Sequence, residues 1–402
     1  MILRAKMVLP IVGPPIEDGA VAVAGEQIVA VGPAQEVCAA HTGEVRDLGA
    51  VVLLPGLINA HCHLDYTCLR GEVTWRGSFV DWLLHLVAAK KLHTDQDYAG
   101  AVERGAQELV QFGTTTVVNI AAFPAVVDLI PPLPLRIHWC FEMIDLKRDQ
   151  SPEEIVRSVE QLIDERPALA GRYGFSPHAP YTASAGLYLL AGRAAQARGV
   201  PLTTHVAESQ EEDDMIRRGT GKMYDYFTLA GRDMTDCKRV GPLQLLDEAG
   251  VLGPQCLAVH ANALTPLDMQ LLHKTGTHVV HCPKSHRYFN RGTPVLSALW
   301  ELGVNICLGT DSLASNDSLN MFAEMQTLAQ VYPRLPADKI LEMATVAGAR
   351  ALRQSDTLGK LTVGATADLI AVRMTEPDPY EAVVFADQPV TFSMIGGKVV
   401  VG

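Results

Sequence analysis

The stretch PGLINAHCHLDYT, residues 55–67, ends an apolar run with two histidines one residue apart, His61 and His63. Residues i and i+2 of a β-strand point to the same side, so a strand here would aim both imidazoles at one place. Neutral imidazole is a common ligand of divalent metal ions. Two histidines supply only half of a tetrahedral site, so a metal site needs further ligands from elsewhere in the chain.

Short apolar runs recur through the central part of the chain, and most of them precede helix-like sequence. There are eight: VLLPGLINAH, TTTVVNI, LRIHWCFEMI, YGFSPH, PLTTHVAE, CLAVHAN, THVVHCP and NICLGTD. One intervening helix is predicted over residues 151–165, with Ser151 as N-cap, Pro152 in the first turn and Glu154 closing a capping box. Eight strand–helix units in series predict an α/β protein with a (β/α)₈ TIM barrel.

Both ends of the chain are rich in strands instead. Residues 19–33, GAVAVAGEQIVAVGP, contain two β-branched runs separated by GEQ, which predicts a hairpin. The sequences GKLTVGATADLIAVRM and VTFSMIGGKVVVG near the C-terminus have the same character. We therefore expect a small β-sandwich module formed by residues 1–54 and 358–402, and a barrel domain spanning residues 55–357.

Composition and charge exclude several classes of function. The net charge is −12 and there is no dense basic run, which argues against a nucleic acid partner. No apolar stretch reaches 18 residues, and prolines interrupt the N-terminal apolar segment, so neither a membrane span nor a signal peptide is expected. The eight scattered cysteines form no C-x-x-C pair and predict free, mostly buried thiols. These features favour a cytoplasmic protein that acts on a small molecule.

Polar residues end the later apolar runs, and in a barrel such strand ends meet at one mouth. Together with His61 and His63, the residues His205 and Asp311 are the candidate ligands. Three neutral imidazoles and one carboxylate suit Zn²⁺, with Fe²⁺ as the alternative first-row ion. We expect one divalent ion per chain.

Four segments, PGLINAHCHLD, THVAE, AVHAN and GTDSLASN, resemble in order the signature segments of the amidohydrolase superfamily. The resemblance covers nearly the whole chain. It is strongest to the subgroup that contains S-adenosylhomocysteine/methylthioadenosine deaminases, aminodeoxyfutalosine deaminases and chlorohydrolases. It implies the same fold, the same four metal ligands and an enzyme. Dimers are common in the family, so the resemblance also suggests a homodimer.

The resemblance also implies roles for residues that are not metal ligands. Glu208 matches the proton-shuttling glutamate, and His260 matches the histidine that orients the attacking hydroxide. His178 matches a substrate-contacting histidine. Phe79 and Trp82, three apart on a predicted helix, match a lid that stacks on the substrate ring, and packing against the barrel is the alternative interpretation of both. Asp311, beside the attacking water, would accept its proton. The acidic residues 211–214, by contrast, are expected to form a solvated face.

One feature favours a single metal ion. Binuclear members of the superfamily carry a carboxylated lysine on strand 4 or 3, whereas this chain has RYGFSPHAP and LRIHWCFEMID there, without lysine; Glu142 is the one residue that could bridge two ions. Within the superfamily that the sequence resembles, a mononuclear site favours hydrolytic deamination of a purine nucleoside or another N-heteroaromatic ring, with release of ammonia. The alternatives are displacement of another leaving group, as in chlorohydrolases, cyclic amide hydrolysis, and a non-catalytic scaffold.

The substrate is less well indicated than the reaction. Methylthioadenosine and adenosylhomocysteine deaminases carry a glutamate shortly after the lid Trp, to grip ribose hydroxyls, whereas this chain has AAKK there. Lys90, Arg148, Lys284 and Arg287 are candidates for contact with an anionic substrate tail, such as that of an aminodeoxyfutalosine-like compound. Solvated loop residues are the alternative interpretation of all four.

Overall fold

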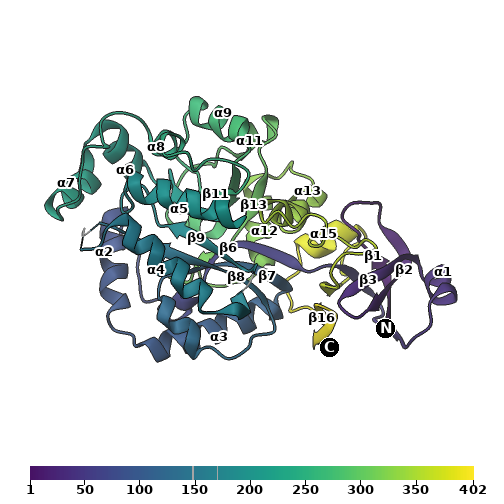
Figure 1. Ribbon diagram of the computed structural model, residues 1–402. Coiled ribbons are helices and arrows are strands. Elements are labelled where there is room, and N and C mark those ends of the chain that lie inside the picture. The colour runs from purple at the N-terminus through teal and green to yellow at the C-terminus, as the bar shows by residue number, and fades with distance from the viewer. Residues whose placement is uncertain (147–148, 170) are drawn as a thin grey trace.

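The larger of two sheets forms the centre of the molecule (Figure 1). The computed structural model describes residues 1–146, 149–169 and 171–402. Within this part of the chain, the sheet has the strand order β13-β12-β11-β10-β9-β8-β7-β6-β14, and its strands pair in parallel. The strands are β6 (Leu57–His63), β7 (Thr114–Ala121), β8 (Arg136–Met143), β9 (Tyr173–Pro177), β10 (Leu202–Val206), β11 (Cys256–His260), β12 (His278–His281), β13 (Ile306–Leu308) and β14 (Asp311–Ser312). All eight apolar runs thus form strands, and the α/β class is confirmed.

The two edges of this sheet approach each other through its last strand segments. β13 pairs with β12, and β14, three residues further on, pairs with β6. Between them the Gly309 amide donates to the His281 carbonyl (2.9 Å) and the Thr310 amide donates to the His61 carbonyl (3.0 Å). A Cβ on Gly309 would lie 2.9 Å from the His61 carbonyl oxygen, so only glycine permits this approach. The sheet therefore curls into a TIM-barrel-like arrangement.

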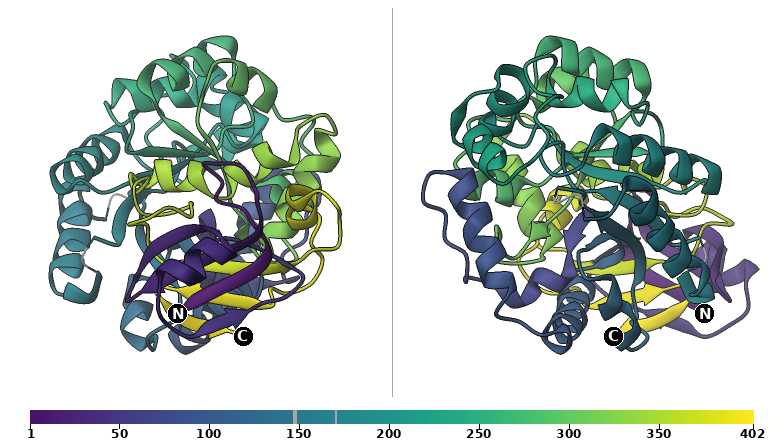
Figure 2. Two further views of the ribbon diagram at one scale, coloured as in Figure 1. Left: turned by 90° about the vertical axis from the view of Figure 1, so that its right-hand side faces the viewer. Right: turned by 60° about the vertical axis from the view of Figure 1, so that its left-hand side comes forward.

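Helices surround this sheet in all three ribbon views (Figures 1 and 2). They are α2 (Phe79–Lys90), α3 (Asp95–Gln111), α4 (Pro152–Asp164), α5 (Ala185–Arg198), α6 (Gln210–Asp213), α7 (Gly221–Leu229), α8 (Pro242–Glu248), α9 (Pro266–Thr275), α10 (Pro283–Tyr288), α11 (Leu296–Glu301), α12 (Met321–Val331), α13 (Ala337–Met343) and α14 (Val346–Ala351). The described helices also include three short 3₁₀ segments, η1 (Leu64–Leu69), η2 (Pro124–Leu129) and η3 (Pro167–Leu169), and a π-helical segment, η4 (Asp214–Arg218). The predicted capping box is confirmed, because Ser151 and Glu154 each accept from the other's backbone amide.

The two ends of the chain lie side by side and form the second sheet (Figure 2). Its order is β17-β16-β15-β5-β1-β2-β3, with β4 paired to β1. The elements are β1 (Ile2–Val8), β2 (Ile16–Ala24), β3 (Gln27–Pro33), α1 (Ala34–Ala40), β4 (Val45–Asp47), β5 (Val51–Pro55), β15 (Leu369–Arg373), α15 (Pro379–Val384), β16 (Phe392–Ile395) and β17 (Lys398–Val401). The predicted hairpin is the antiparallel pair β2–β3. These strands share one hydrogen-bonded sheet; a sandwich and the proposed domain limits stay predictions.

The two sheets meet at Gly56, between β5 and β6. A Cβ at this position would overlap the Thr115 side chain, so a glycine is needed where the chain passes from one sheet to the other. An ion pair between Arg136 on β8 and Asp368, next to β15, ties the sheets together nearby. In the described part of the chain, no helix is both long and apolar enough to cross a membrane. All eight cysteines are free and six of them are buried, as predicted.

Candidate metal centre and active site

Four buried side chains converge at the carboxyl ends of the barrel strands. His61, His205, His260 and Asp311 each offer one ligand atom, and these atoms all lie within 4.8 Å of one another. They come from β6, β10, β11 and β14, which parallel pairing brings to one end of the sheet. His61 Nε2 lies 3.5 Å from Asp311 Oδ1. Such a donor set, three imidazoles and one carboxylate, suits a divalent metal ion.

His63 belongs to the same centre, although it is not in that group of four. Its Nε2 lies 3.3 Å from His205 Nε2 and 3.9 Å from Asp311 Oδ1. Its ring stacks on Tyr66, with ring centres 5.0 Å apart. All four ligands predicted from the sequence thus lie together, and His260 lies among them as a fifth metal-competent side chain. Which four would bind the ion stays a prediction.

The protonation of these groups fits a cation. The His205 Nδ1 contacts the His178 carbonyl oxygen (2.9 Å), so the neutral ring holds its proton there and leaves the Nε2 lone pair free. Burial lowers the pKa of His205 to about 3 and holds the pKa values of His63 and His260 well below the ordinary value, so all three are neutral at pH 7. Two neutral imidazoles with Nε2 atoms facing each other are what a shared cation would stabilise.

Asp311 has the opposite protonation. Burial opposes its ionisation, but its contact with His61 and the neighbouring imidazoles hold its pKa well below the ordinary value. Its Oδ2 accepts hydrogen bonds from Ser285 Oγ (2.7 Å) and Ser315 Oγ (3.0 Å). Asp311 also has a left-handed φ of 58°, and His260 has one of 73°. Positive φ angles in two non-glycine residues of one site are strained conformations that redirect the side chains.

Glu208 lies beside this centre, two residues beyond the end of β10. It is 5% exposed, and its Oε2 lies 3.9 Å from His260 Nε2. Arg291 Nη2 donates to its Oε1 (3.0 Å). Burial raises the pKa of Glu208 to about 7, and the charge of Arg291 limits the rise. A carboxyl with a pKa in this range can both donate and accept a proton near neutral pH.

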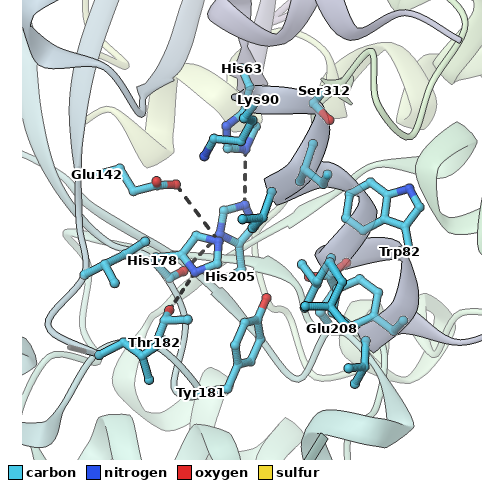
Figure 3. Close-up of a pocket in the computed structure, with 18 of the residues that line it drawn as sticks. His63, Trp82, Lys90, Glu142, His178, Tyr181, Thr182, His205, Glu208 and Ser312 are labelled. Atoms are coloured by element: carbon cyan, nitrogen blue, oxygen red, sulfur yellow. Dashed lines mark hydrogen bonds and ion pairs between the residues drawn. The ribbon is translucent and has the colours of Figure 1, made fainter. Parts of the chain in front are cut away.

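A cavity of about 200 Å³ opens onto this centre (Figure 3). The predicted ring-contacting residues line it: Phe79 and Trp82 stack on each other at 5.8 Å, and His178 lies across the cavity. His178 Nδ1 pairs with Thr182 Oγ1 (2.7 Å). Near His178, Figure 3 shows the carboxylate of Glu142, whose Oε1 lies 4.0 Å from His178 Nε2. The outer wall is apolar and consists of Leu83, Leu84, Leu86, Val87, Ile144, Leu146, Tyr226 and Phe227.

The cationic candidates differ in position. Lys90 lines the cavity, donates to Tyr66 Oη (2.6 Å) and lies over the Tyr66 ring. Lys284 instead pairs with Asp317, and Arg287 donates to Gln330 Oε1 (3.2 Å); neither lines the cavity. Arg148 lies outside the described residues. Among the three candidates that the structure describes, Lys90 alone lines the cavity.

The expectation of a solvated acidic face at residues 211–214 is wrong. Glu212 and Asp213 are buried, and Glu211 accepts hydrogen bonds from the amides of Phe79 (2.7 Å) and Val80 (3.2 Å). The run is not solvated because buried backbone amides face Glu211 and Glu212 and donate hydrogen bonds to them. Sequence reasoning also missed Arg291, Ser285 and Ser315. Their partners lie between 4 and 83 residues away in the chain, a range without local signal.

Comparison with known proteins agrees with these observations. The sequence model described as "Amidohydrolase family" matches residues 52–400, and one described as "Imidazolonepropionase-like composite domain, bacteria" matches residues 19–43. A 5-methylthioadenosine/S-adenosylhomocysteine deaminase from Syntrophobacter fumaroxidans is 34% identical, over 96% of this chain and 88% of that protein. An aminodeoxyfutalosine deaminase from Deinococcus radiodurans is 31% identical, over 83% and 81%. The crystal structure of a zinc-bound adenosine deaminase from Xanthomonas campestris has a TM-score of 0.84 at 27% identity, covering 100% of this chain and 92% of that one.

Proposed function

Since the chain belongs to the amidohydrolase family and is a hydrolase of carbon–nitrogen bonds, we propose that it removes the exocyclic amino group of a purine nucleoside. The observation that carries this proposal is the buried Glu208, with a pKa of about 7, next to a centre of imidazoles and Asp311. Deamination of an aromatic ring needs a group that first donates a proton to a ring nitrogen and later delivers one to the amine. Glu208 has both the position and the pKa for this task.

His61, His63, His205 and Asp311 would hold one divalent ion, Zn²⁺ or alternatively Fe²⁺. Such an ion lowers the pKa of a water ligand toward neutrality and so supplies hydroxide. Asp311 accepts the proton of the attacking water, and His260, between Asp311 and Glu208, hydrogen-bonds the attacking oxygen. His260 is also the alternative fourth ligand, since its Nε2 lies 4.0 Å from Asp311 Oδ2.

The proton inventory of this reaction closes. Glu208 in its acid form protonates a ring nitrogen, which makes the adjacent carbon electrophilic. The new carbon–oxygen bond forms there, and the carbon–nitrogen bond to the amino group breaks. Asp311 takes one proton of the water, and Glu208 passes the other, from the added hydroxyl group, to the departing amine. The proton on Asp311 then restores the acid form of Glu208, so the two protons of the water replace those gained by the ring and by the leaving group. One nucleoside and one water give one keto ring and one ammonia.

The cavity also narrows the substrate class. Phe79 and Trp82 offer a stacking surface for the ring, and His178 can contact its edge. The outer wall is apolar, so it favours an uncharged or aromatic 5′ substituent over the zwitterionic amino acid of adenosylhomocysteine. Lys90 and Glu142 lie on the side opposite Trp82 and are the groups available for polar parts of the substrate (Figure 3).

The test is ammonia release by metal-reconstituted protein from adenosine, methylthioadenosine, aminodeoxyfutalosine and adenosylhomocysteine. We expect kcat/KM for methylthioadenosine, whose 5′ substituent is uncharged, to exceed that for adenosylhomocysteine by about tenfold or more, the effect of placing unpaired charges against an apolar wall. The reverse order would refute the substrate class. No release from any of the four compounds would refute the deaminase itself.

Two alternative reactions and three structural proposals accompany this one. Halide displacement from a triazine-like ring is the second candidate; it needs less ring protonation, so a dispensable Glu208 would favour it. Cyclic amide hydrolysis usually requires two ions, so a measured two metals per chain would favour that reaction. We also propose a closed (β/α)₈ barrel over residues 55–357, a β-sandwich module from residues 1–54 and 358–402, and a cytoplasmic homodimer, whose mass light scattering would measure.

A further inference from the structure

The acidic segment on α6 contacts two parts of the proposed active site. One is the aromatic wall on α2, with Phe79 and Trp82, and the other is the turn that carries Glu208. Glu211 and Glu212 are neighbours in the chain, but their carboxylates have different partners. Glu211 Oε1 accepts from the Phe79 amide (2.7 Å), and its Oε2 accepts from the Val80 amide (3.2 Å). These are the first two residues of α2, whose amides have no partner within the helix. The carboxylate therefore anchors the positive end of the helix that carries Phe79 and Trp82.

Glu212 binds the backbone of the turn that carries Glu208. Its side chain is fully buried; Oε1 accepts from the Ala207 amide (3.0 Å) and Oε2 accepts from the Glu208 amide (2.7 Å). Ala207 has a left-handed φ of 50°, so the backbone turns sharply just before Glu208. Without Glu212, two buried amides would lose their acceptor at the turn that sets the direction of Glu208.

Arg291 contacts both Glu208 and the aromatic wall. Its Nη2 donates to Glu208 Oε1 (3.0 Å), and its guanidinium carbon lies 4.9 Å from the centre of the Phe79 ring. Phe79 is thus held through its amide by Glu211 and through its ring by Arg291. Glu208 is held through its amide by Glu212 and through its carboxylate by the same Arg291.

We propose that Glu211 and Glu212 are positioning residues, which tie the helix bearing the aromatic wall to the turn bearing Glu208. This inference rests on the function proposed above. Neither carboxylate lines the cavity, so both act through Phe79 and Glu208 and not by touching the substrate. In each glutamate the two backbone amides bond different side-chain oxygens, and glutamine would put an NH₂ donor in place of one of these acceptors.

The experiment therefore replaces each glutamate by glutamine, a change that preserves shape. Loss of one buried hydrogen bond of this kind corresponds to about a tenfold effect. We expect Glu211→Gln to raise KM about tenfold, because the stacking wall shifts, and Glu212→Gln to lower kcat about tenfold, because the proton donor shifts. The matched control is Asp214→Asn, since Asp214 bonds Gln210 and Arg218, away from both the aromatic wall and the Glu208 turn. Glu211→Asp, which retains the charge, should recover part of the wild-type KM.

A double-mutant cycle tests whether the aromatic wall and the Glu208 turn are linked. Glu211 and Arg291 share Phe79, so the effects of Glu211→Gln and Arg291→Met on kcat/KM should deviate from additivity by about threefold or more. Asp214→Asn combined with Arg291→Met should be additive. If all the variants fold and turn over like the wild type, or if the first cycle is additive within about twofold, the inference is wrong. Should Glu212→Gln fail to fold, the Glu211 variants decide alone.

Amide hydrogen exchange provides a readout that needs no substrate. Glu211→Gln should accelerate exchange at Phe79 and Val80, and Glu212→Gln should do so at Ala207 and Glu208, whereas Asp214→Asn should change neither. If exchange accelerates at these amides but the wild type releases no ammonia, the proposed function is wrong, while the positioning role of Glu211 and Glu212 stands. Exchange that stays unchanged in an active enzyme would refute the positioning role and leave the function intact.

Discussion

At the scale of single residues, Asp311 connects the histidines of the centre to two buried serines. It faces His61 on one oxygen and accepts from Ser285 and Ser315 on the other. We expect Asp311→Asn to lose bound metal and at least about 10²-fold in kcat, since an amide is a weaker ligand and no base. Metal content by mass spectrometry and turnover by ammonia release check this. Wild-type turnover by a folded Asp311→Asn protein would contradict the mechanism.

Glu208 acts at a different point, because it is not a proposed ligand. Glu208→Gln should lower kcat by about 10²–10⁴-fold while metal content stays at the wild-type level. Activity should also depend on pH with a definite sign. The acid form is required and burial raises its pKa to about 7, so kcat/KM should fall as the pH rises through that value. A rate profile between pH 5.5 and 9 measures this, and a rate that rises across neutrality would contradict it.

Arg291 offers a separate check on the same pKa. Its positive charge opposes the effect of burial and lowers the pKa of Glu208. Arg291→Met should therefore raise that pKa and move the falling limb of the rate profile to higher pH, with a lower maximal rate. An unchanged limb would mean that the limb belongs to another group. Arg239→Met is a suitable control, since Arg239 is an exposed residue whose partner is Glu248.

At the scale of elements, Gly309 is the position on which the last strand depends. A Cβ there would press on the His61 backbone, whose ring is in the metal centre. We expect Gly309→Ala to cost about 1–3 kcal/mol of unfolding free energy and to weaken metal binding. Thermal melting and metal titration measure the two effects. Gly186→Ala in α5, where the added carbon has ordinary contacts, should be neutral or slightly stabilising.

The elements were also the part most readable from the sequence. Of the nine strands described in the barrel sheet, all but the two-residue β14 coincide with an apolar run, because buried parallel strands need continuous apolar sequence. The α4 cap was readable because Ser151 and Glu154 interact within one turn. By contrast, the roles of Glu211 and Glu212 depend on amides that reach them through the fold. Phe79 is 132 residues from Glu211, so only the assembled structure brings the two together.

The candidate site, too, was readable from the sequence only in part. The sequence brought together His61, His63, His205, Glu208, His260 and Asp311 because each lies at or just beyond the end of a strand. It did not indicate that His260 lies within ligand distance of the others. A residue's place on a strand gives the position of its ligand atom only to within several ångströms. It could not distinguish Lys90, on the cavity wall, from Lys284, which pairs with Asp317.

At the scale of the whole molecule, buried carboxyls make stability depend on pH. Burial raises the pKa values of Glu212 and Glu324 to about 8. In the unfolded chain these groups ionise near their ordinary value of 4.5, so between these limits the folded state binds more protons. Their contribution to stability is complete at low pH and is lost as the pH rises through about 8. The metal-free protein should therefore melt at a lower temperature at pH 8.5 than at pH 6.5, and scanning calorimetry would reveal any opposite trend.

The strand β5 lies between β1 and β15 in the terminal sheet, although its two neighbours are separated by most of the chain. A ribosome must therefore synthesise the residues up to Arg373 before Val51 can find its partner. Until then, one edge of the apolar strand β5 has no partner strand. In the chain, β5 comes directly before β6, which carries His61 and His63. Nascent chains of this protein should depend on a chaperone, or on slow synthesis of the final segments, to avoid premature aggregation.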